Sequence, residues 1–165
     1  MPFAATHIIS TVSFFDSIKS KYFSKLALEG SFAFYAAIGS LLPDIDLPLG
    51  QFLRYLNLEL SHGTLTHTLL FAFIFASFAV IFRFVKKDKI SQIFLIFTCG
   101  IVAHLFLDYF LGGGAKEGVT WFYPIITTPY KIHLLSAIPS DNTFESLDAL
   151  VLLYFFYKKT PILFR

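Results

Sequence analysis

Residues 90–111 read ISQIFLIFTCGIVAHLFLDYFL and contain one formally charged residue, Asp108. As an α-helix this stretch would be roughly 30 Å long, which matches the hydrocarbon core of a bilayer. A second stretch, 65–85 (LTHTLLFAFIFASFAVIFRFV), carries only Arg83, near its end. A chain of 165 residues is too small to bury two helices that are apolar all round. We therefore expect both stretches to cross a membrane.

The composition agrees with a membrane protein. Hydrophobic residues make up 56% of the chain and charged residues 15%, with a mean hydropathy of +0.68. That leaves too little polar material to cover a soluble domain. The length suits a single domain covering residues 1–165. The net charge of +2, without a basic cluster interleaved with aromatic residues, does not indicate nucleic acid binding.

Weaker apolar segments flank the two strong ones. They are closer to the lower limit of spanning length, so they could be tilted or packed inside a bundle. The sequence therefore predicts an all-α, polytopic membrane bundle of about five helical segments. These are residues 2–18, 26–42, 65–85, 90–111 and 147–157.

The basic residues predict the orientation of the bundle. Lys and Arg prefer the cytoplasmic ends of membrane spans. The link between the two strong spans carries four of them: Arg83, Lys86, Lys87 and Lys89. With this link inside, the N-terminus lies outside and the C-terminus lies in the cytoplasm.

Histidines and acids lie at the predicted outer ends of the same segments. His104 and Asp108 share one helix face, and ionisable groups in a span are usually paired or functional. Asp44 and Asp46 follow Pro43, and in an extended turn both carboxylates would point the same way. His67 would lie in the first helical turn, where the helix dipole favours the neutral imidazole. Taken singly, each has a simpler explanation as a capping turn, an interfacial residue or a hydrogen-bonded pair.

Together these groups predict a metal site. The topology brings them to one outer face, where mixed His and carboxylate ligands suit zinc and also manganese or iron. They exceed what one tetrahedral zinc ion needs, so two or more ions would fit, as in enzymes that carry out displacement at phosphorus. The candidate ligands are His7, Asp44, Asp46, His62, His67, His104 and Asp108.

Five short motifs together resemble a known family. In chain order they are Thr6-His7, residues 42–46 (LPDID), the His62-to-His67 element, residues 104–108 (HLFLD) and residues 118–124 (GVTWFYP). Their order over roughly residues 1–125 is similar to that of the membrane-bound metal-dependent hydrolases. That family is typified by a LexA-binding bacterial inner-membrane protein and is distantly related to zinc-dependent phospholipase C and P1-type nucleases.

The resemblance implies a zinc-dependent hydrolase in a bacterial inner membrane, acting on phosphoesters and potentially on phospholipids. Metal-activated water would be the nucleophile, and the catalytic candidates are Asp44, Asp46 and His67. The seven residues would be ligands or their immediate neighbours. The oligomeric state is left open.

One motif departs from the family pattern. The family usually has Arg and Gly directly after the first histidine of the pair, where this chain has Gly63 and Thr64. A basic group that could hold a phosphate is therefore missing from its usual place. Arg54, Lys116 or Lys131 could substitute for it.

Two other functions remain open. A transporter could bind a cation with the same ligands, and a non-catalytic scaffold could use a structural metal. Transporters place their sites near the middle of the bilayer. The middle of each strong span, around Phe75 and Cys99, has no ionisable group, which argues against a transport pathway.

Overall fold

The computed structural model describes residues 4–22, 31–58, 63–111, 118–132, 134 and 148–155. These residues confirm an all-helical architecture, in which an isolated β-bridge joins Val119 and Tyr130. Residues 148–155 form a further helical segment. The helices are α1 (Ala4–Tyr22), α2 (Phe32–Leu41), the 3-10 turn η1 (Leu42–Ile45), α3 (Asp46–Arg54), α4 (Leu69–Phe84) and α5 (Asp88–Leu111).

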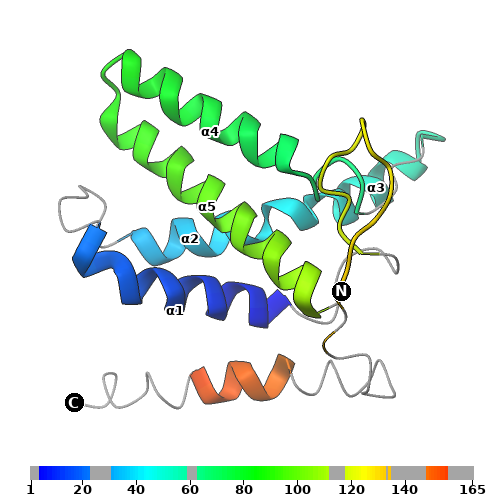
Figure 1. Ribbon diagram of the computed structural model, residues 1–165, viewed down its shortest axis with the longest axis horizontal. Helices are drawn as coiled ribbons and strands as arrows, with labels where there is room; N and C mark the ends of the chain where they lie inside the picture. Colours follow the sequence, from blue (N-terminus) through cyan, green and yellow to red (C-terminus); the bar gives the residue numbers. More distant parts are fainter. Residues whose placement is uncertain are drawn as a thin grey trace.

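Helix α5 is the centre of the bundle. It packs against α1, α2 and α4. α4 and α5 form an antiparallel hairpin, and α2 and α1 lie on the other side of α5 (Figure 1). α1 and α4 run away from the end of the bundle where α3 begins, and α2 and α5 run back towards it.

Two apolar clusters hold this arrangement together. One joins α1, α2 and α5 through residues such as Phe15, Phe32 and Ile96. The other joins α4 and α5 to the loop at 118–121, around Ile101 and Leu105. Burial of these side chains fixes α5 against both of its neighbours.

Helices α2 and α5 cross at a pair of glycines. A Cβ added to Gly100 would lie 2.6 Å from the backbone carbon of Gly39, closer than real Cβ atoms approach. A Cβ on Gly39 would lie 2.9 Å from the Cα of Phe97. Small residues allow such close backbone contact between membrane helices. The crossing brings the C-terminal end of α2 against the middle of α5.

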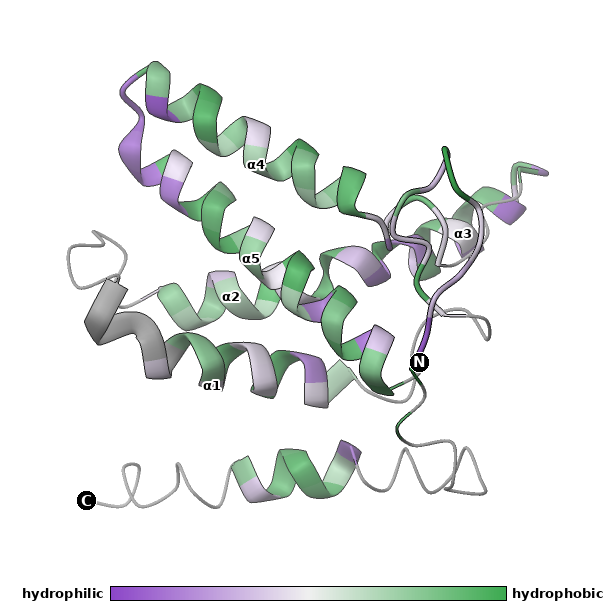
Figure 2. Cartoon of the chain, viewed as in Figure 1, coloured by the Kyte–Doolittle hydropathy of each residue, from purple (hydrophilic) through white to green (hydrophobic). Residues whose placement is uncertain are grey.

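The surface of the hairpin is apolar along its length. Figure 2 shows hydrophobic residues along α4 and most of α5, with hydrophilic residues at the turn that joins them. Phe73 is 67% exposed and Phe84 is 82% exposed. By length and composition, α5 and the helical run Phe32–Arg54 could each cross a membrane. These features fit a helical membrane protein.

Several helix boundaries differ from those expected. The segment predicted at 65–85 is helical only from Leu69 to Phe84, about 24 Å long. Residues before it form a loop, because the Thr68 hydroxyl accepts a hydrogen bond from Phe71 N and caps the helix there. The expected span 90–111 is confirmed as α5. The segment expected at 26–42 is helical from Phe32 within the described residues.

Helix α3 was not expected from the sequence. Pro43 ends α2 as predicted, but the chain then continues through the 3-10 turn into α3. The expectation of an extended turn around Asp44 and Asp46 was therefore wrong. Pro at the start of a helical turn loses no hydrogen bond, because the first N–H groups have no partner within the helix.

Candidate metal centre

Four segments of the chain meet at one end of the bundle. They are the start of α1, the turn after α2, the loop at 63–68 and the last third of α5. The turn that joins α4 to α5 lies at the opposite end (Figure 1). His104 is about 24 Å along α5 from Asp88 at that turn. The predicted separation of basic turn and histidine–acid cluster is therefore present in the fold.

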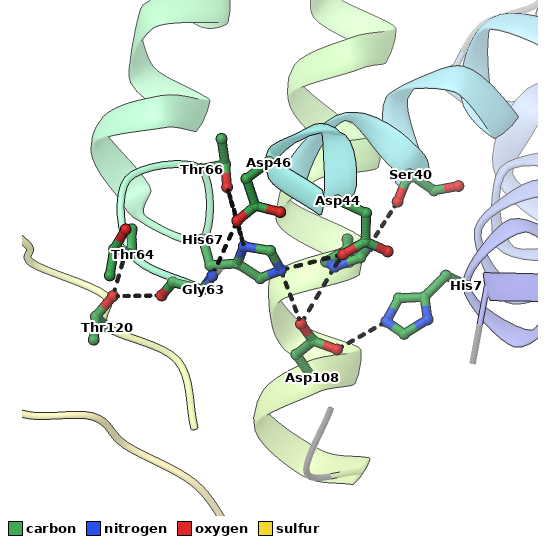
Figure 3. Close-up of polar contacts among 11 residues, drawn as sticks. His7, Ser40, Asp44, Asp46, Gly63, Thr64, Thr66, His67, Asp108 and Thr120 are labelled. Atoms are coloured by element: carbon green, nitrogen blue, oxygen red, sulfur yellow. Dashed lines mark hydrogen bonds and ion pairs between the residues drawn. The ribbon is translucent and has the colours of Figure 1, made fainter. Parts of the chain in front are cut away.

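Four side-chain atoms form the centre of the cluster. Nε2 of His67 lies 3.4 Å from Oδ1 of Asp44 and 3.5 Å from Oδ2 of Asp108. Nε2 of His104 lies 3.5 Å and 3.2 Å from the same two oxygens. Figure 3 shows Asp44, His67 and Asp108 pointing towards one another from three segments of the chain. His67, His104 and Asp108 are buried.

The spacing of these atoms fits a metal ion. Ligand atoms about 2.0–2.2 Å from a tetrahedral zinc ion lie roughly 3.3–3.6 Å from one another. Within the described residues, Asp44 Oδ1, His104 Nε2 and Asp108 Oδ2 are buried without a hydrogen-bond partner. Buried polar atoms are almost always satisfied, so three of them facing one point make this a candidate site for a cation. Asp44, His67 and His104 form one potential ligand group, and His7, His104 and Asp108 form a second.

The ring of His104 is held by a backbone carbonyl. Its Nδ1 lies 2.6 Å from the carbonyl oxygen of Ser40. A carbonyl can only accept, so Nδ1 donates to it, and Nε2 is the nitrogen that faces the cluster. The Ser40 carbonyl is at the end of α2, and the glycine crossing brings it within reach.

Asp46 lies behind His67. The Thr66 hydroxyl donates to Asp46 Oδ2 over 2.9 Å, and Gly63 N donates to the same oxygen over 3.0 Å. Nδ1 of His67 lies 3.2 Å from Thr66 Oγ1 and 3.5 Å from Asp46 Oδ2. Asp44 and Asp46 therefore lie on the two sides of the His67 ring (Figure 3). This differs from the expectation that both carboxylates converge on one cation.

The surrounding acids change the protonation of His67. Burial lowers the pKa of this imidazole, but hydrogen bonds to Asp44 and Asp46 and the charges of Asp108 and Asp46 raise it more. The net result is a pKa of about 9, against an ordinary 6.5. The expected first-turn position, with a neutral imidazole, was wrong because His67 precedes the N-cap of α4. A cation at Nε2 would have to displace a proton.

A comparison with protein families identifies the chain. The model of the YdjM inner membrane protein family matches residues 1–163. The chain belongs to the YdjM inner membrane protein family. No curated protein and no solved structure matches it. The family description supports an inner-membrane location, in agreement with the candidate spans.

In this YdjM family member, His7 meets the cluster through Asp108. Its Nε2 lies 3.1 Å from Asp108 Oδ1, the oxygen that faces away from the four-atom centre. The rings of His7 and His104 are in contact, with centroids 4.1 Å apart. His7 therefore orients Asp108. His7, His104 and Asp108 together form the second potential ligand group.

The start of α1 is held by a distant acid. Asp148 accepts hydrogen bonds from Ala5 N over 3.1 Å and from Thr6 N over 2.6 Å. These are N–H groups of the first helical turn, which have no partner within the helix. Asp148 thus fixes the backbone that carries His7.

In this YdjM family member, the backbone conformation explains the glycine at position 63, where the chain departs from the family motif. Gly63 has φ of 81°, a left-handed conformation that favours glycine over arginine. Its carbonyl also accepts from the Thr120 hydroxyl over 3.1 Å, which ties the loop to residues 118–121. Of the proposed substitutes, Arg54 and Lys131 are exposed. His62 and Lys116 lie outside the described residues.

Sequence reasoning missed the groups that anchor the ligands in this YdjM family member. The Ser40 carbonyl has no sequence signal, because any residue provides a backbone carbonyl. Thr66 was not among the predicted site residues. Its proximity to both His67 and Asp46 gives a weak signal, because hydroxyls often join a histidine to a carboxylate.

Proposed function

We propose that this protein is a membrane-embedded metal-dependent hydrolase of phosphoesters. Zinc would be held by Asp44, His67, His104 and Asp108. The observation that carries the proposal is the set of 3.2–3.5 Å separations among their inward-facing atoms. Two nitrogens and two carboxylate oxygens are a donor set that zinc accepts, and manganese or iron would also bind it.

A zinc ion bound there would supply Lewis acidity towards a phosphoryl oxygen and a nucleophile at neutral pH. The protein's own groups would orient the site. The Ser40 carbonyl holds the His104 ring, and Thr66 with Asp46 holds the His67 ring. Such partners of ligating histidines fix the tautomer and raise the basicity of the ligand nitrogen.

Asp44 marks the entrance to the site. Its side chain is 13% exposed, whereas those of His67, His104 and Asp108 are 1% exposed or less. A substrate phosphate would therefore approach past Asp44. We assign Asp44 as a ligand that can also accept a proton from the attacking water, and Asp46 as the residue that orients His67.

The site would face the outer side of the inner membrane. Support comes from the turn between α4 and α5, where Lys86 and Lys87 lie at the end opposite the cluster. Basic residues at span ends favour the cytoplasm. The substrate would then be an extracytoplasmic phosphoester.

A structural metal is the second candidate function. It is favoured by the near-complete burial of His67, His104 and Asp108, because structural zinc sites are closed and catalytic ones keep an open position. In this alternative the metal would join α5 to the loop at 63–68 and the turn after α2, and no substrate would be cleaved.

The experiment measures metal content and hydrolysis on the same purified protein. Zinc-loaded protein should contain at least one ion per chain and hydrolyse bis-(p-nitrophenyl) phosphate. Asp108→Asn should lose most of the zinc and lower hydrolysis by about 100-fold or more. Asp88→Asn, an exposed acid at the other end of the same helix, is the matched control and should change neither.

Two results would contradict the proposal. If purified wild-type protein bound no transition metal, the proposed metal-dependent hydrolase would have no metal to act with. Zinc-loaded protein without hydrolysis of any phosphoester in a broad panel would favour the structural role. In that case chelation should lower the melting temperature and nothing else.

A further inference from the structure

An apolar groove lies between α1 and α5, beside the candidate metal centre. Its volume is about 570 Å³, within the range of roughly 300–1,000 Å³ typical of small-molecule sites. Phe14 and Phe15 line it from α1, and Cys99, Val102 and Phe106 line it from α5. Its chemistry therefore suits a hydrocarbon ligand.

The groove ends next to the candidate metal centre. Ala103 and Leu107 line it and are the residues directly before His104 and Asp108. On α1, Thr11 lines it one turn after His7. From Leu107 to Thr98 the groove covers roughly 14 Å of α5, reaching the middle of this candidate span. One end is therefore beside the cluster and the other is deep in the apolar part of the bundle.

A buried polar residue in the wall of the groove indicates the chemistry of the ligand. The Thr11 side chain is buried, and its hydroxyl has no hydrogen-bond partner within the described part of the chain. A threonine inside a helix commonly bonds to the carbonyl four residues earlier, which this hydroxyl does not do. An acceptor on a bound ligand, one turn from His7, would satisfy it.

We propose that this groove holds one acyl chain of a glycerophospholipid, the substrate of the hydrolase proposed above. The acyl chain lies along α5, and its ester carbonyl accepts a hydrogen bond from the Thr11 hydroxyl. The phosphate then lies at the end of the groove next to His104 and Asp108 and enters the cluster past Asp44, its most exposed member. An inner-membrane protein meets such lipids at high concentration, and a free soluble phosphoester would leave the groove without a role.

The reaction that follows is a hydrolysis at phosphorus. Water adds its oxygen to the phosphorus, and the bond between phosphorus and the glycerol oxygen breaks. The glycerol oxygen takes a proton, which gives diacylglycerol and a phosphorylated headgroup. The attacking water supplies the proton that the glycerol oxygen takes up, so no further reactant is needed.

The first test separates lipid from soluble substrates. Val102→Trp fills the groove, and Val80→Trp, on the exposed surface of α4, is the matched control. Val102→Trp should slow hydrolysis of dioleoylphosphatidylcholine by about tenfold or more and leave bis-(p-nitrophenyl) phosphate unchanged. Val80→Trp should change neither. Equal loss on both substrates, or on neither, would overturn the groove assignment.

The Thr11 contact has its own test. Thr11→Val keeps the shape of the side chain and removes its hydroxyl. Wild-type protein should hydrolyse the diester-linked lipid faster than the diether-linked analogue, and Thr11→Val should abolish that preference. A preference that survives in Thr11→Val would show that the hydroxyl does not bind the ester.

A binding measurement distinguishes failure of the groove from failure of the hydrolase. Cys99 is the only cysteine of the chain and lines the groove. In metal-free protein in detergent, dioleoylphosphatidylcholine should slow maleimide labelling of Cys99 by about fivefold or more, whereas glycerophosphocholine should not. Protection without any hydrolysis would keep the groove and reject the hydrolase. Hydrolysis of soluble phosphoesters without protection would reject the groove.

Discussion

The two candidate ligand histidines, His67 and His104, are each held through the nitrogen that points away from the cluster. Ser40 provides a carbonyl for His104, and Thr66 with Asp46 provides oxygens for His67. Because those nitrogens carry protons, both Nε2 atoms face the oxygens of Asp44 and Asp108. The orientation of the ligand atoms therefore comes from backbone and hydroxyl groups that do not themselves belong to the ligand set.

Zinc binding should release protons at neutral pH. The pKa of His67 is raised to about 9, so metal-free protein carries the imidazolium, which zinc must deprotonate at Nε2. We expect about one proton released per zinc bound, and weaker zinc binding as the pH falls below 9. Titration calorimetry in buffers of different ionisation enthalpy measures the release.

The control is Asp46→Asn, which removes one of the charges that raise this pKa. It should lower the number of protons released at neutral pH. A binding enthalpy that does not depend on the buffer would contradict the prediction.

At the level of helices, α1 depends on Asp148. Its carboxylate accepts hydrogen bonds from the N–H groups of Ala5 and Thr6, which are the two residues directly before His7. Replacing a capping side chain with Ala typically costs about 0.5–2 kcal/mol. We expect Asp148→Ala to lower the melting temperature and weaken zinc binding, measured by thermal unfolding and competition with a zinc indicator.

Asp88→Ala is the matched control for this variant, because Asp88 is exposed and pairs with Arg83 far from the cluster. An Asp148→Ala protein with wild-type stability and zinc affinity would show that the cap does not position α1.

At the α2–α5 crossing, we expect a single added methyl group to lower both stability and zinc affinity. In Gly100→Ala the new Cβ would meet the backbone of Gly39 at 2.6 Å, so the helices must separate. Separation lengthens the bond from His104 Nδ1 to the Ser40 carbonyl. Stability should fall by about 1–3 kcal/mol and zinc affinity should fall with it.

Cys99→Ala, a small substitution at the neighbouring position, should have a much smaller effect on both quantities. A Gly100→Ala protein that retains full zinc affinity would separate the crossing from the metal site.

The sequence predicted elements with a strong pattern and missed those with mixed signals. The helix at 90–111 followed from its uninterrupted apolar run. α3 did not, because Pro48 and Gly50 are typical of loops, although Pro is tolerated in a first helical turn. The start of α4 was placed too early, because Thr66 and Thr68 serve either within a helix or as caps.

The sequence predicted which residues form the candidate site, but it did not predict their individual contacts. His104 and Asp108 follow from helical spacing, and the topology brings His67 and Asp44 beside them. The position of Asp46 behind His67 could not be predicted, because it depends on a 3-10 turn in place of an extended one. Contacts to backbone groups such as the Ser40 carbonyl leave no trace in the sequence.

Across the whole molecule, charge is divided between the two ends of the α4–α5 hairpin. The Lys86–Lys87 turn lies at one end and the candidate metal centre at the other (Figure 2). The apolar surface between them suits contact with lipid. The orientation in the membrane therefore decides which compartment the site can reach.

Cysteine labelling tests that orientation. In a Cys99→Ala background, Lys87→Cys should react with a membrane-impermeant maleimide only from the cytoplasmic side. Tyr55→Cys, at an 87% exposed position just after α3, should react only from the outer side. The reverse pattern would place the site in the cytoplasm.

The cluster also joins segments that are synthesised far apart in time. His7 and Asp108 are separated by 101 positions, and both potential ligand groups found in the described residues contain His104, so neither is complete before α5 has been made. Metal loading should therefore be the last step of maturation, after insertion of the chain. Cells grown without zinc should accumulate inserted protein that lacks metal. Zinc added after translation has been stopped should load this protein, as measured by its metal content on purification.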